Sequence, residues 1–190
     1  MMALENGMNL KLLFQQLKSL RTVTQKPILL MGYLNSVLQF GIEKFYVECS
    51  KVGVDGVILP DLPLDEFNEF HKEITQRLNI KVVFLVSPDT KPERVKLLDG
   101  ASGGFLYLLS SNSTTGGVKG VSKKLIKQDV KNPVLIGFGI KGQKEFSEAC
   151  QYANGAIIGS SFIELLSTST NFQKDISEFT CNVKGKLVKS

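Results

Sequence analysis

The sequence has few of the residues that build metal and redox sites. It contains one histidine, His71, and three cysteines, Cys49, Cys150 and Cys181, which no C-x-x-C spacing joins. Zinc sites and disulfide frameworks need several such residues at characteristic spacings, so we expect neither here. Unpaired cysteines are typical of a reducing compartment, which favours a cytoplasmic protein with Cys49 and Cys150 as small core residues on helices.

Long apolar runs and concentrated charge are also missing. No segment approaches the roughly 18 apolar residues of a membrane-spanning helix, and Met1 is not followed by the basic and apolar regions of an export signal. The net charge is +5, but the lysines are spread along the chain without a basic run that carries interleaved aromatic residues. Such runs are typical of single-stranded nucleic-acid binding. We therefore expect neither a membrane nor a nucleic acid as a partner.

What the sequence does contain is a repeated alternation of short apolar runs and helical stretches. Six apolar runs begin near residues 28, 56, 81, 105, 133 and 155, and a helix fits between each pair. Parallel strands need such a crossover, so the pattern predicts an α/β fold with a parallel sheet. A doubly wound sheet and a (β/α) barrel both fit this pattern.

The stretch from Pro133 to Ser161 favours the barrel. Two apolar runs, within P-V-L-I-G-F-G-I and G-A-I-I-G-S-S, end at Gly137 and Gly159. A helix could begin after each run, so backbone N–H groups can approach an anion there. Barrels often bind phosphate at the loops after their last two strands. A dinucleotide fold would carry its G-x-G-x-x-G motif directly after the first strand, whereas Gly137 and Gly139 follow the fifth apolar run.

The third helical stretch carries the single histidine. Its apolar stripe is predicted to comprise Leu64, Phe67, Phe70, Ile74 and Leu78, with His71 on the polar, solvent-facing side. An exposed helical histidine has no catalytic implication by itself.

Six motifs in order and spacing resemble the tryptophan synthase alpha chain family. They are A-L-E-N-G-M (3–8), P-I-L-L-M-G-Y-L-N (27–35), G-V-D-G-V-I-L-P-D-L-P (53–63), F-L-Y-L-L-S-S-N-S-T-T-G (105–116), G-F-G-I (137–140) and G-A-I-I-G-S (155–160). The resemblance implies an incomplete (β/α)8 TIM barrel with about six βα units. It implies one partial domain over 1–190, with a helix before strand three over 1–26, strands three to eight over 27–161, and C-terminal helices and a tail over 162–190.

The family's activity is a retro-aldol cleavage of indole-3-glycerol phosphate to indole and glyceraldehyde 3-phosphate. The resemblance implies that indole passes to a beta chain that holds pyridoxal phosphate (PLP), within an alpha2-beta2 tetramer, and that this chain needs no cofactor. The phosphate-binding residues implied are Gly116, Gly139, Gly159 and Ser160. Supporting roles in the active site are implied for Tyr107 and Thr115.

The same resemblance implies two further sets of residues. The walls of the indole pocket would be Leu30, Ile58 and Phe138. The surface that faces the beta chain would include Asp61 and Pro63. Plainer roles stay open, because Asp61 could cap a turn, Tyr107 could be a core residue, and Gly159 to Ser161 could form an ordinary helix cap.

The family's first two βα units precede the A-L-E-N-G-M motif, and they hold its two catalytic carboxylates. We therefore expect a truncated chain that is inactive as these 190 residues, because the reaction needs a positioned acid and base. Three hypotheses remain open. The full-length product is the enzyme; or the shortened chain only binds phosphate or the beta chain; or the chain is another phosphate-binding barrel enzyme. The last would need different carboxylates and lysines at strand ends, which the sequence does not show.

Overall fold

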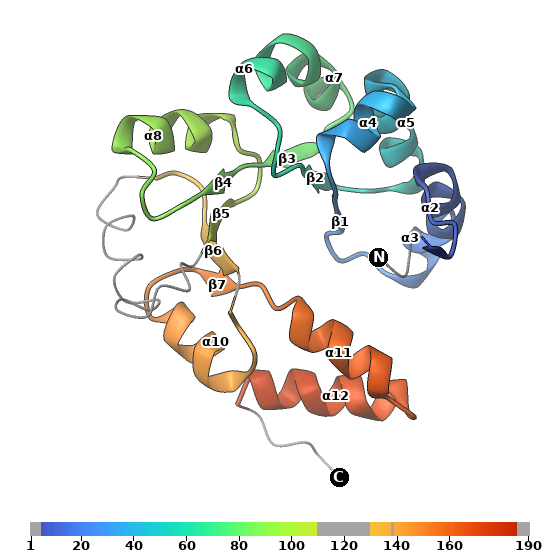
Figure 1. Ribbon diagram of the computed structural model, residues 1–190, viewed down its shortest axis with the longest axis vertical. Helices are drawn as coiled ribbons and strands as arrows, with labels where there is room; N and C mark the ends of the chain where they lie inside the picture. Colours follow the sequence, from blue (N-terminus) through green and yellow to red (C-terminus); the bar gives the residue numbers. More distant parts are fainter. Residues whose placement is uncertain (1–4, 110–129, 138, 186–190) are drawn as a thin grey trace. The chain divides into compact units, whose positions relative to one another are not determined.

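The computed structural model describes residues 5–109, 130–137 and 139–185 (Figure 1). Its chain divides into two compact units. Unit 1 comprises Met1–Phe84 with Ala101–Gly104, and unit 2 comprises Leu85–Gly100 with Phe105–Ser190. The strands of both units are parallel and alternate with helices, as the spacing of the apolar runs predicts.

Unit 1 is built on a three-stranded parallel sheet. Its strands, in the order β1-β2-β3, are β1 (Leu29–Met31), β2 (Gly56–Ile58) and β3 (Lys81–Val83). The register pairs Leu30 with Val57 and Val57 with Val82. The helical elements are α2 (Leu10–Leu17), α3 (Leu20–Val23), α4 (Leu34–Phe40), α5 (Ile42–Val52), α6 (Leu64–Glu66), the π-helical turn η1 (Phe67–His71) and α7 (Lys72–Arg77).

The core of unit 1 centres on α5. This helix ends at Gly53, whose φ of 79° lies in the left-handed region that glycine adopts without a steric penalty. The Phe45 ring packs edge-on against Phe14 of α2 at 5.9 Å and against Tyr46 at 5.3 Å between centroids. Four α5 side chains are buried: Phe45, Tyr46, Cys49 and Val52.

The predicted orientation of the third helical stretch is wrong at two residues. His71 is fully buried, whereas Phe70 is 55% exposed. The cause is the π-helical turn η1, because one extra residue per turn changes the direction in which successive side chains point. The stripe that faces the core therefore includes His71 in place of Phe70.

The apolar run Lys81–Val86 forms two strands where one was predicted. β3 pairs with β2, whereas β4 (Leu85–Val86) pairs with β5 (Leu106–Leu109) of unit 2. Between β3 and β4, the Phe84 N–H donates to Ser102 Oγ at 3.2 Å, so it takes no part in the sheet. The hydrogen-bonded strands of the described residues thus form two open sheets rather than a closed barrel.

Unit 2 is built on a four-stranded parallel sheet in the order β4-β5-β6-β7. Its last two strands are β6 (Val134–Gly137) and β7 (Gly155–Ala156), and its described helices are α8 (Pro92–Ala101), α10 (Gln143–Cys150), α11 (Ser160–Thr168) and α12 (Phe172–Val183). Cys150 is exposed at the end of α10, contrary to prediction, because Ala149 takes the buried position there. Among the described residues, no helix is long and apolar enough to span a membrane.

A buried carboxylate fixes the start of β6. Asp99 of α8 is 5% exposed and accepts the backbone N–H groups of Lys131 at 2.7 Å and Asn132 at 3.0 Å. Burial opposes its charged form, but these hydrogen bonds and the Asn132 side chain outweigh that effect and lower the pKa of Asp99. The strand that leads to the glycine-rich G-F-G-I motif therefore begins from an anchored point.

Candidate functional site

The strongest candidate for a ligand site lies at the carboxyl ends of β6 and β7. The register pairs Leu135 with Gly155 and Ile136 with Ala156, and the Ile157 N–H extends the ladder by donating to the Ile136 carbonyl at 2.7 Å. Neighbouring parallel strands deliver their following loops to the same edge of a sheet, where α/β proteins bind ligands. The loops of the G-F-G-I and G-A-I-I-G-S motifs therefore follow adjacent strands at the same edge of the sheet.

The loop after β7 leads directly into α11. Gly159 is the N-cap residue, and its carbonyl accepts the N–H groups of Phe162 at 3.0 Å and Ile163 at 3.1 Å. The N–H groups of Ser160 and Ser161 fall in the first helical turn, where no intrahelical acceptor exists. A Cβ placed on Gly159 would meet no atom of the described residues within 4 Å, so they leave the space before this helix open. Such a terminus carries partial positive charge and can bind an anion.

Gly139 lies in the loop after β6. Its φ of 74° is in the left-handed region, which disfavours any side chain. The glycine is therefore needed for the turn that follows β6. The loops on both strand ends thus keep their backbone accessible, one through a glycine turn and the other through a helix N-terminus.

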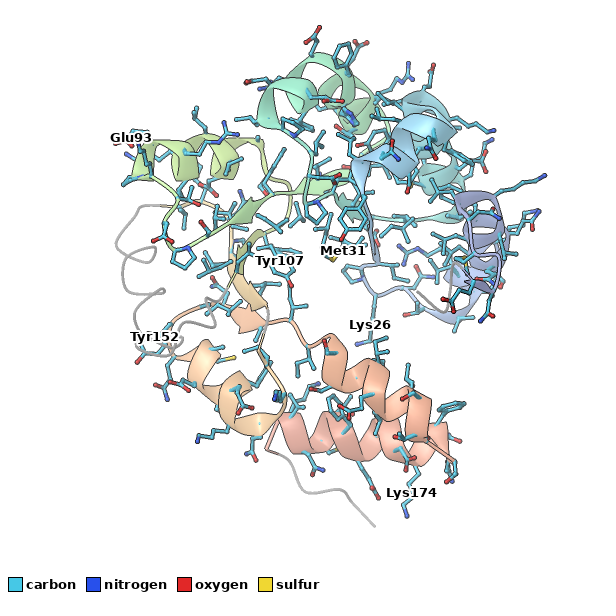
Figure 2. All side chains as sticks on the ribbon, in the orientation of Figure 1. Lys26, Met31, Glu93, Tyr107, Tyr152 and Lys174 are labelled. Carbon is cyan, nitrogen blue, oxygen red and sulfur yellow. The ribbon has the colours of Figure 1, made fainter. Side chains whose placement is uncertain are left out.

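Tyr107 projects from β5 next to this region (Figure 2). Its Cα is paired with that of Leu135 on β6, its side chain is 5% exposed, and burial raises the pKa of its hydroxyl. A Cβ built on Gly137 would overlap the hydroxyl and ring of Tyr107. Gly137 is thus the residue that admits the Tyr107 ring, a role that the sequence did not reveal because tertiary packing creates it.

Two predicted pocket residues lie on neighbouring strands of unit 1. Leu30 on β1 is partly buried, and Ile58 on β2 is 7% exposed. The register places Met31 opposite Ile58, so Leu30 and Ile58 are one pairing step apart. Because successive side chains along a strand point to opposite faces, Leu30 and Ile58 lie in one sheet but on opposite faces of it.

The predicted partner-facing residues follow β2. Asp61 is exposed, and its Oδ1 accepts the Leu34 N–H at 2.9 Å, so it caps α4 from a neighbouring loop. Pro63 is the exposed N-cap residue of α6. Thr115, Gly116 and Phe138 lie outside the described residues. Across the part of the chain that the structure describes, no three His, Cys, Asp or Glu residues are grouped to hold a metal ion.

His71 is a buried core residue rather than a surface one. Its Nδ1 lies 2.8 Å from the Tyr46 hydroxyl, and its Nε2 is buried without a hydrogen-bond partner among the described residues. Burial lowers the pKa of His71 and raises that of Tyr46. The periodicity of the sequence could not reveal this pair, because the π-helical turn creates it.

Comparison with known proteins identifies the family. A family model for the tryptophan synthase alpha chain matches residues 1–189. The chain belongs to the tryptophan synthase alpha chain family. This is a lyase family of tryptophan biosynthesis whose members need no cofactor of their own, since PLP is held by the beta chain.

Two curated relatives match nearly the whole of this chain. The alpha chain of Flavobacterium psychrophilum is 44% identical over 188 residues, which are 95% of this chain and 74% of that protein. The alpha chain of Bacteroides fragilis is 43% identical over 182 residues, which are 92% of this chain and 69% of that protein. The chain therefore spans about three quarters of the first relative and slightly less of the second.

Solved structures of tryptophan synthase share the fold. An alpha subunit from Pyrococcus furiosus matches with a TM-score of 0.84 at 32% identity, over 96% of this chain and 76% of that chain. A structure of the alpha2-beta2 complex from the same organism matches with a TM-score of 0.83 at 30% identity, over 96% of this chain and 77% of that chain. The α/β fold therefore matches that of the tryptophan synthase alpha chain.

Proposed function

We propose that these 190 residues form the phosphate-binding part of a tryptophan synthase alpha chain, which cleaves indole-3-glycerol phosphate to indole and glyceraldehyde 3-phosphate. The observation that carries the proposal is the edge of unit 2 at which the glycine turn of Gly139 and the N-terminus of α11 follow neighbouring strands. The ligand phosphate would accept hydrogen bonds from backbone N–H groups there, at Gly116, Gly139, Gly159 and Ser160.

The remaining residues would serve the organic part of the substrate. Tyr107 would support the glycerol chain near the phosphate, together with Thr115. Ile58 and Phe138 would contact the indole ring, which is apolar and favours burial against such side chains. The register of β1 and β2 places Leu30 on the sheet face opposite to that of Ile58, so Leu30 would not contact the same ring. This assignment requires that the strands of both units belong to one (β/α)8 barrel domain, of which residues 1–190 supply about six βα units.

The partner in this proposal is the tryptophan synthase beta chain. Asp61 and Pro63 would belong to the surface that faces it, and the assembly would be an alpha2-beta2 tetramer. Both residues are exposed in unit 1, which leaves them accessible to another chain. PLP would stay in the beta chain.

Turnover requires an acid and a base group, and the family resemblance assigns neither to these 190 residues. In the retro-aldol cleavage, indole C3 gains a proton as the indole N–H loses one. Removal of the glycerol hydroxyl proton then forms the aldehyde and breaks the C–C bond, whose electrons return to the ring as the nitrogen regains its proton. The family performs these transfers with two carboxylates from segments before the A-L-E-N-G-M motif. A positioned acid or base contributes about 10²–10⁴-fold to a rate. We therefore expect the 190-residue polypeptide to bind ligand without useful turnover.

The test measures indole release from indole-3-glycerol phosphate by two polypeptides. One is the 190-residue chain, and the other carries in front of it the N-terminal segment of the Flavobacterium psychrophilum alpha chain that this chain does not match. We expect indole release only from the second, at least about 10²-fold faster. Equal release from both would refute the need for the added carboxylates. Failure of both, with ligand still bound, would favour the binding function alone.

A further inference from the structure

The helix α4 begins without a cap of its own. Its N-cap residue is Tyr33, whose side chain makes no capping hydrogen bond. The Leu34 N–H, which belongs to the first turn, instead donates to Asp61 Oδ1 at 2.9 Å. Asp61 is 27 positions further along the chain, in the loop that follows β2. A carboxylate is well suited to this position because it faces the positive end of a helix.

The backbone that leads into α4 is held by hydrogen bonds on both sides of Tyr33. The Gly32 N–H donates to the Ile58 carbonyl at 3.1 Å, which continues the β1–β2 ladder by one residue. The backbone is thus fixed at Gly32 by β2 and at Leu34 by Asp61. Only Tyr33 lies between these two points.

The residues displayed by this segment are large and exposed. Tyr33 is 71% exposed, and Met31 at the end of β1 is 56% exposed. Aromatic residues and methionine are enriched in protein interfaces, and a tyrosine held rigidly loses little entropy on binding. Both are in unit 1, on the β1 side of the loop that carries Asp61 and Pro63.

We propose that Asp61 is a positioning residue for the partner-facing surface, and that it acts through the Leu34 N–H to hold the backbone that presents the Tyr33 ring to the beta chain. This inference rests on the proposed function for the identity of the partner. Asp61 thus contributes an acceptor oxygen to its own chain, and the contact with the partner is made by Tyr33.

The substitution Asp61→Asn separates this role from a direct charge contact. Asparagine keeps an oxygen that can accept the Leu34 N–H, whereas Asp61→Ala removes it. We expect calorimetric titration with the Flavobacterium psychrophilum tryptophan synthase beta chain to give a Kd for Asp61→Asn within about threefold of the unsubstituted chain. We expect Asp61→Ala to weaken binding about tenfold, in line with the loss of a helix cap. Equal weakening by both variants would overturn the proposal.

A double variant tests the route through Tyr33. If Asp61 acts by holding that ring, Asp61→Ala should weaken binding much less in a Tyr33→Ala background than in the unsubstituted chain. Additive effects would contradict the proposal. The matched control is Asp65→Ala, which removes an exposed carboxylate of α6 that makes no hydrogen bond to α4 in the described part of the chain, and it should leave the Kd unchanged.

A second measurement does not depend on the partner. Hydrogen exchange of the Leu34 amide should be about equally slow in the unsubstituted chain and in Asp61→Asn, and at least about tenfold faster in Asp61→Ala. Unchanged exchange in Asp61→Ala would overturn the positioning role even if the beta chain binds. The exchange rates could be as expected while neither the unsubstituted chain nor any variant binds the beta chain. That result would confirm that Asp61 caps α4, but it would refute the proposal that the cap serves binding to this partner.

Discussion

The helix α5 of unit 1 and the helices α11 and α12 of unit 2 bury their apolar faces to very different extents. In α5, four of eleven residues are buried, and the Phe45 ring packs edge-on against Tyr46 and against Phe14 of α2. Within the described residues, α11 has no buried residue and α12 has only Val183. Unit 1 is therefore a packed scaffold, whereas the helix that begins at the candidate phosphate site is held loosely.

The loose packing has a direct functional meaning. α11 and α12 contact each other, with Phe162 and Phe179 ring centroids 5.8 Å apart, but Ile163 is 64% exposed and Phe172 is 56% exposed. Segments with few buried apolar contacts open at low free-energy cost. An anion bound at the N-terminus of α11 would stabilise this helix by mass action.

The largest difference between the two regions should appear when a phenylalanine is truncated in each. Phe45→Ala removes a ring that is 2% exposed, and we expect a loss of about 3–5 kcal/mol in the free energy of unfolding. Phe172→Ala removes an exposed ring and should cost less than about 0.5 kcal/mol. Urea unfolding measures both. Equal losses would show that α12 is as well packed as α5.

A smaller loss of stability is expected at Gly137, which is tightly packed against Tyr107 in the candidate site. Gly137→Ala forces a Cβ into the Tyr107 ring and should cost about 1–3 kcal/mol. Gly159→Ala meets no described atom within 4 Å, but alanine is a poorer N-cap residue than glycine, so it should cost about 0.5–1 kcal/mol. Unfolding of the double variant Gly137→Ala, Tyr107→Ala should show a loss smaller than the sum of the single losses. A strictly additive result would contradict the contact.

The smallest expected effect is a pH dependence in unit 1. Burial lowers the pKa of His71 below its ordinary value of 6.5, so the unfolded chain takes up a proton at a higher pH than the folded chain. Stability should therefore be complete above pH 6.5 and fall as the pH decreases from 6.5 to the lowered pKa.

His71→Phe isolates this contribution. The variant should flatten the dependence of the urea midpoint on pH between 6.5 and 5, while Asp99→Asn should leave that part of the curve intact. The pKa of Asp99 is below its ordinary value of 3.8, so its own contribution is lost only at lower pH. An unchanged slope in His71→Phe would contradict the assignment.

Much of the fold was predictable because short apolar runs with helices between them have few alternatives to a parallel sheet. The strands at Leu29, Gly56, Leu106 and Val134 begin within a residue or two of the predicted runs. The break at Phe84 could not be predicted, because it depends on a hydrogen bond from the Phe84 N–H to Ser102 Oγ, and only the folded chain brings these two residues together.

The candidate site divides in the same way. Gly139 and Gly159 could be found because glycine at a strand end is a local signal for backbone that a ligand can approach. The burial of His71 and the contact between Gly137 and Tyr107 could not, because a π-helical turn and a strand register create them. The capping role of Asp61 was among the alternatives that the sequence left open, but its partner, the Leu34 N–H, was not.

The loops after β6 and β7 are proposed to bind the phosphate of the ligand. A titration of the isotope-labelled 190-residue chain with glyceraldehyde 3-phosphate, followed by the NMR shifts of backbone amides, tests it most directly. We expect saturable shifts that are largest at Gly139, Gly159 and Ser160, with α5 unaffected. Replacing Ser160 by proline, which has no N–H to donate, should abolish these shifts. Shifts spread over surface lysines without saturation, or no shift at Gly159 and Ser160, would contradict it.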